Sequence, residues 1–94
     1  MVNHKFIKQH EVILKTKLGW NVIYIKLRIK HISPGFIVCS NNVRYAAMTG
    51  REIGTSTPDF AYNLLDLDEE TGKTYYQLYI EQDFVKKQKE QSNE

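Results

Sequence analysis

The stretch that decides the fold is Asn21–Ile32, NVIYIKLRIKHI, in which apolar and polar residues alternate with a period of two. The apolar positions are Ile23, Ile25, Leu27 and Ile29, and the positions between them are Tyr24, Lys26, Arg28 and Lys30. Successive side chains of a strand point to opposite faces, so this pattern buries one face and exposes the other. The sequence therefore predicts a long, half-buried strand with a basic outer side.

The residues ahead of this strand, His10–Lys17, predict an antiparallel partner for it. We expect a register in which Val12 faces Ile25 on the inner side, because this register aligns the apolar residues of both strands. A shift by one residue would turn the apolar side chains outward. The expected register requires a four-residue turn over Lys17–Trp20.

The middle of the chain continues with short elements. The apolar run Phe36–Cys39 predicts a buried strand. Val43–Thr49 fits either a fourth strand or one helical turn with Asn42 as its N-cap and Gly50 as its stop. Thr49–Asp59 is rich in Gly, Thr and Ser, which predicts a loop.

The last part of the chain predicts a second hairpin from Phe60–Leu67 and Thr74–Ile80, followed by a short helix over Phe84–Gln91. Residues 1–9 and 90–94 are expected to fray. The predicted fold is therefore mainly β, a β-rich α+β domain over the whole chain. Its core is a small antiparallel curled sheet or barrel of five to six strands, built from two hairpins and followed by a short C-terminal helix.

Composition bounds the class of protein. The chain has 94 residues, 41% of them hydrophobic and 26% charged, which is ordinary for one globular domain. Its single cysteine, Cys39, can form neither an intrachain disulfide nor a cysteine-based metal cage, and its apolar surroundings predict burial. No apolar run approaches the ~18–20 residues of a membrane helix, and residues 1–10 lack a signal-peptide core. We therefore expect a cytoplasmic protein with no membrane partner and no cofactor.

Charge is divided unevenly along the chain. Residues 1–50 contain eight lysines and arginines against one acid, and residues 51–94 contain five against ten. A basic face favours polyanionic partners, unless the two halves neutralise each other across the fold. Aromatic rings on this face would stack on bases while the cations follow the phosphates of a nucleic acid. The residues predicted to bind nucleic acid or a nucleoprotein are Lys15, Lys17, Trp20, Tyr24, Lys26, Arg28 and Lys30.

The alternative function is protein binding through exposed tyrosines. Tyr62, Tyr75 and Tyr79 fall on the second predicted hairpin, beside acidic residues that suit a basic partner. The abundance of residues with AT-rich codons fits an inhibitor or adaptor from a phage or mobile element. A homodimer through a free sheet edge is compatible with either function. A purely structural interpretation treats the residues predicted to bind nucleic acid, which form a basic-aromatic strip, differently. In this interpretation the strip is a second core layer beneath the C-terminal helix or the second hairpin.

Catalytic machinery is thinly represented. His4, His10 and His31 are candidates for acid–base chemistry in a small nuclease, although the expected register places His10 on the inner side. The sequence contains no nucleophile elbow and no paired metal-ligand spacing. It therefore favours a non-enzymatic binding protein.

Overall fold

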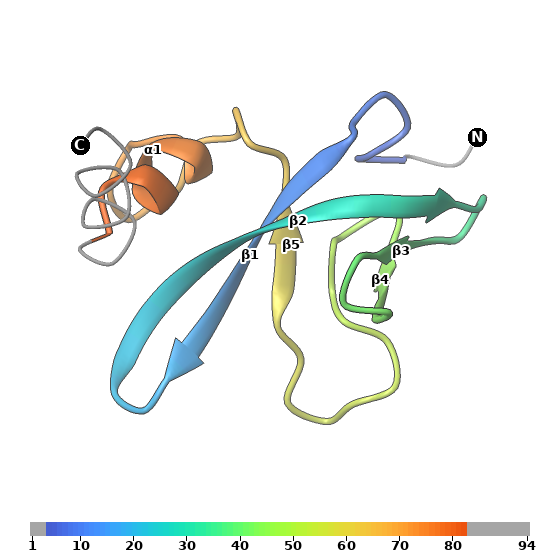
Figure 1. The fold of residues 1–94 in the computed structure, drawn as a ribbon, viewed down its shortest axis with the longest axis horizontal. Coiled ribbons are helices and arrows are strands. Elements are labelled where there is room, and N and C mark those ends of the chain that lie inside the picture. The colour runs from blue at the N-terminus through green and yellow to red at the C-terminus, as the bar shows by residue number, and fades with distance from the viewer. Residues whose placement is uncertain (1–3, 83–94) are drawn as a thin grey trace, which may run out of the picture.

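The described part of the chain, residues 4–82, forms an antiparallel sheet with one short helix in the computed structural model of the protein (Figure 1). The elements are β1 (Glu11–Leu18), β2 (Asn21–Ile32), β3 (Phe36–Cys39), β4 (Arg44–Ala46), β5 (Phe60–Tyr62) and α1 (Tyr75–Ile80). The strand order is β4-β3-β2-β1-β5, and each pairing is antiparallel. The sheet curls into a half-barrel, which confirms the prediction of a mainly β fold.

The first hairpin forms as predicted, but in a different register. Val12 lies opposite Leu27 instead of Ile25, a displacement of two residues. The reason is the turn, which uses only two residues, Gly19 and Trp20, between the paired Leu18 and Asn21. Gly19 has a φ of 64°, and glycine at the first central position suits the type II′ turn that matches strand twist. A displacement of two keeps every side chain on its predicted face.

The core lies inside the curl of the sheet. Its fully or almost fully buried members are Phe6, Val12, Leu14, Ile37, Cys39, Tyr45 and Ala61. Phe6 comes from the segment before β1, and Lys5 N–H donates to Ala47 O at 2.8 Å. The prediction that residues 1–9 fray is therefore wrong for the described residues of that segment. Burial raises the pKa of the Cys39 thiol to about 11, so this side chain is protonated at neutral pH, as an inert core cysteine should be.

The gap between the two outermost strands is filled by residues 50–53. On one side Ala46 N–H donates to Arg51 O, and on the other Ala61 N–H donates to Gly50 O, both at 2.8 Å. The predicted loop over Thr49–Asp59 therefore contains a short bridging segment, and β4 and β5 are connected through it. The ambiguous stretch Val43–Thr49 contains a strand, β4, followed by a turn.

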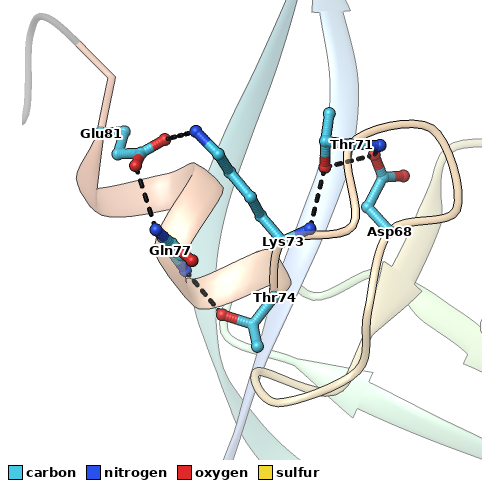
Figure 2. Close-up of polar contacts among 6 residues, drawn as sticks. All are labelled: Asp68, Thr71, Lys73, Thr74, Gln77 and Glu81. Atoms are coloured by element: carbon cyan, nitrogen blue, oxygen red, sulfur yellow. Dashed lines mark hydrogen bonds and ion pairs between the residues drawn. The ribbon is translucent and has the colours of Figure 1, made fainter.

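The prediction of a second hairpin from Phe60–Leu67 and Thr74–Ile80 is wrong. β5 pairs with β1, and the residues after Thr74 form the helix α1 instead of a strand. Thr74 is the N-cap, and its Oγ1 accepts a hydrogen bond from Gln77 N–H at 3.1 Å (Figure 2). This cap satisfies a backbone donor that a helix start leaves unpaired, and it prevails over the strand preference of tyrosine.

The helix predicted over Phe84–Gln91 lies outside the described residues. Within residues 4–82, no helix is long and apolar enough to cross a membrane.

Replacing Gly50 with alanine should open the connection between β4 and β5. A Cβ at Gly50 would lie 2.1 Å from Ala61 O, and the φ of Gly50 is 80°. We expect Gly50→Ala to lower the free energy of unfolding by about 3 kcal/mol, because steric overlap adds to backbone strain. The matched control is Gly54→Ala, where φ is 91° but nothing lies within 4 Å, so only about 1 kcal/mol of strain applies. Urea denaturation measures both, and equal losses would contradict the steric argument.

Candidate nucleic-acid interface

The helix α1 covers part of the outer face of the first hairpin, where nucleic-acid contacts were predicted. The Tyr24 ring lies 6.5 Å from the Tyr75 ring of α1. The Tyr24 carbonyl also accepts a hydrogen bond from Gln82 Nε2 at 2.8 Å. Tyr24 is therefore half-buried in a second layer of packing, and the helix occupies the face on which a base would stack.

Two of the predicted lysines are paired with acids. Lys15 Nζ lies 3.6 Å from Asp68 Oδ1, and Lys26 Nζ lies 3.6 Å from Glu11 Oε2. Lys26 Nζ also lies 5.8 Å from the centre of the Tyr79 ring, within cation–π range. The positive charge of the hairpin is thus neutralised locally beside α1.

The tyrosines of the alternative site pack against one another. The prediction that Tyr75 is exposed is wrong, because its residue is only 6% accessible and its ring stacks on Tyr62 at 4.0 Å between centroids. Its hydroxyl donates to Asp68 Oδ1 at 3.3 Å. Tyr62 and Tyr79 are half-buried. The structure therefore uses Tyr75 and Tyr62 to attach α1 to the sheet.

Asp68 lies in the segment before α1 and accepts hydrogen bonds from Thr71 and from Tyr75 of α1. Burial raises the pKa of its carboxyl group, but this is outweighed by hydrogen bonds from Thr71 (Figure 2) and by the charge of Lys15, so the pKa is lowered. The pKa of the Tyr75 hydroxyl is raised, chiefly by burial and then by its neighbours Tyr62 and Asp68. Asp68 is therefore an ionised, buried acceptor that holds β1 and α1 together.

The other predicted residues remain accessible. Trp20 is fully exposed in the turn of the hairpin, and Lys17 is exposed near it. Arg28 and Lys30 are exposed further along β2, where β3 adjoins it. The predicted strip is thus divided into a hairpin tip and a separate basic region, with α1 covering the residues between them.

A β-bulge enlarges the basic region. Ile29 pairs with Cys39 and His31 pairs with Val38, so Lys30 is an extra residue in β2. After the bulge His31 lies on the outer face, whereas strict alternation would place it inside. Val38 in turn pairs with Arg44 of β4. We call the exposed set Arg28, Lys30, His31 and Arg44 the basic face.

The basic face has defined side-chain contacts. Lys30 Nζ donates to Asn42 Oδ1 at 2.7 Å, and Asn42 has a φ of 64° in the turn after β3. The Arg44 guanidinium lies 5.7 Å from the centre of the Phe36 ring. These neutral partners restrict the side chains without cancelling their charge.

No carboxylate neutralises the basic face from its own strands. The sequence contains no Asp or Glu between Glu11 and Glu52. Glu11 lies opposite Arg28 in the register, but its carboxylate pairs with Lys26. Within residues 4–82, none of the lysines and arginines of this face takes part in an ion pair. The face therefore presents uncompensated positive charge to solvent.

The sequence did not lead us to place His31 or Arg44 in a nucleic-acid interface, although His31 was an acid–base candidate. A signal for His31 existed, because Ile32 follows Ile29 at a spacing of three and breaks the period of two. Arg44 required the order of the sheet, which places β4 beside β3. Of the histidines proposed for acid–base chemistry, His4 Nδ1 accepts from Phe6 N–H at 3.1 Å. His10 is exposed at the end of the hairpin, so it is not a buried structural histidine.

Comparison with known proteins adds no relative. A scan against protein-family models matches no family, and searches of curated proteins and of solved structures find no match.

Replacing Asp68 with asparagine should weaken the attachment of α1 in a pH-dependent way. The pKa of Asp68 is lowered by folding, so its carboxylate stabilises the fold above about pH 4, the unfolded value. This stabilisation is lost as the pH falls below about 4 toward the folded pKa. We expect Asp68→Asn to cost about 1–3 kcal/mol at pH 7. Part of this difference should disappear in more acidic solution.

Urea midpoints at pH 7 and in the acid range measure this effect. The matched control is Glu69→Gln at the exposed neighbouring position, where we expect little change. A pH-independent difference between the parent and Asp68→Asn would contradict an electrostatic role for this carboxylate.

Proposed function

We propose that this protein is a non-enzymatic nucleic-acid-binding protein that contacts phosphates through the basic face. The observation that carries the proposal is the uncompensated charge of Arg28 and Lys30 on β2 and of Arg44 on β4, the two strands that flank β3. Lysine and arginine that neutralise phosphates release counterions, and this release supplies most of the affinity of non-specific binding. A cytoplasmic location, where nucleic acid is accessible, belongs to the same proposal.

The geometry of the face suits a nucleic-acid backbone. His31, Val38 and Arg44 form a row across three strands, and neighbouring strands are about 4.8 Å apart. Alternate residues along a strand are about 6.6–6.8 Å apart, close to the phosphate spacing of an extended single strand. Phe36 offers a ring at the margin of the charges. Binding through such a face would depend strongly on salt and weakly on sequence.

The test replaces the three permanent charges together, as Arg28→Gln, Lys30→Gln and Arg44→Gln in one variant. We expect binding to a single-stranded oligonucleotide to fall sharply, with the slope of log affinity against log salt reduced by about 2. Fluorescence anisotropy of a labelled strand at about 50 and 200 mM salt measures both quantities, and circular dichroism checks the fold.

The matched control removes the same number of charges elsewhere, as Lys8→Gln, Arg51→Gln and Lys73→Gln. All three residues are exposed and lie outside the basic face. This variant should keep most of the affinity of the parent. An equal loss in both variants would show attraction to net charge alone, and undiminished binding by the first variant would exclude the basic face.

A further inference from the structure

An open groove lies beside the distal half of the first hairpin. β1 pairs with β5 only as far as Lys15 and Phe60. Beyond that pair, the end of β1 and the segment that precedes β5 border a space of about 520 Å³. Val22, Phe60 and Tyr62 lie on the same outer face of the sheet and supply apolar surface to this groove. Lys17 contributes to one wall and Asp59 to the other. The space is large enough for an aromatic side chain.

The most exposed aromatic side chain of the described residues stands next to this groove. Trp20 is 101% accessible, and it lies in the turn that connects Lys17 to Val22, two paired residues that line the groove. It is therefore only two positions along the chain from the apolar surface of the groove. Complete exposure of an indole is unfavourable in water, and tryptophan is the side chain most enriched at protein–protein hot spots.

We propose that a second copy of this chain occupies the groove, with Trp20 of each protomer inserted beside Val22 and Phe60 of the other. Because Trp20 and the groove adjoin each other on one hairpin, a single two-fold axis satisfies both insertions at once. Charge complementarity supports this occupant. Three charged residues line the groove, Lys15, Lys17 and Asp59, and Lys15 is already paired with Asp68. The two-fold axis would bring Lys17 of each protomer, which lies near Trp20 at the hairpin tip, to Asp59 of the other.

The proposal differs from the phosphate-binding one and does not depend on it. The residues of the basic face lie on β2 and β4, whereas the groove lies between β1 and the residues before β5. A monomeric variant should therefore keep the affinity of each chain for an oligonucleotide, so the two proposals fail separately.

Trp20 reports its own environment because it is the single tryptophan. We expect its fluorescence emission to shift to the blue as the full chain is concentrated from the nanomolar to the high micromolar range. Sedimentation equilibrium over the same range should show a monomer–dimer transition. Trp20→Ala should weaken the dimer at least about 30-fold, the effect of losing one hot-spot side chain.

The matched control is Leu18→Ala, which removes another exposed apolar side chain from the same tip but on the opposite face. This variant should dimerise like the parent, and Asp59→Lys should weaken the dimer while Asp59→Lys combined with Lys17→Asp restores it. A chain that stays monomeric with water-exposed emission would overturn the proposal. A monomer with blue-shifted emission would also overturn it, because another part of the same chain would then cover Trp20.

Discussion

The pairing of β1 with β2 is the interaction on which every other contact depends. Its inner face supplies Val12 and Leu14 to the core, and its outer face supplies the site where Tyr24 meets α1. β3 attaches to the free edge of β2, and β5 attaches to the free edge of β1. Because side chains alternate along both strands, one register determines the core, the attachment of the helix and the position of the exposed charges together.

The fold was predictable where the evidence is local and periodic. Alternation over Asn21–Ile32 identified β2 and both of its faces. The predicted register with β1 was incorrect by two residues, and because this number is even, the assignment of side chains to the two faces stayed correct. The second hairpin was not predictable in this way. Tyrosines after Thr74 favour a strand by propensity, but the Thr74 cap and the stacking of Tyr75 on Tyr62 favour a helix. That stacking partner lies in another element of the chain and leaves no local signal.

The candidate interface was predictable only in part, for two physical reasons. The charge of Lys15 is removed by Asp68, which lies far away in sequence, so composition alone could not separate paired from unpaired lysines. The bulge at Lys30 changes which face the following residue occupies, so strict alternation assigns His31 to the wrong side. Arg28 and Lys30 were identified correctly as exposed cations, because the alternation holds up to the bulge and both residues lie beyond the reach of α1.

Acidic and basic residues are concentrated in different parts of the molecule. Asp66, Asp68, Glu69 and Glu70 line one pocket together with Tyr75 of α1. The strands β3 and β4, the second of which begins with Arg44, lie toward the opposite end of the long axis from α1 (Figure 1). The formal net charge of the chain is only +2, so it does not reveal this separation of charge. A small protein whose opposite charges are separated turns in the field of an approaching polyanion, within a screening distance of about 8 Å at physiological salt. The acidic end would then be held away from the polyanion, and the rate of encounter would depend on rotation as well as on diffusion.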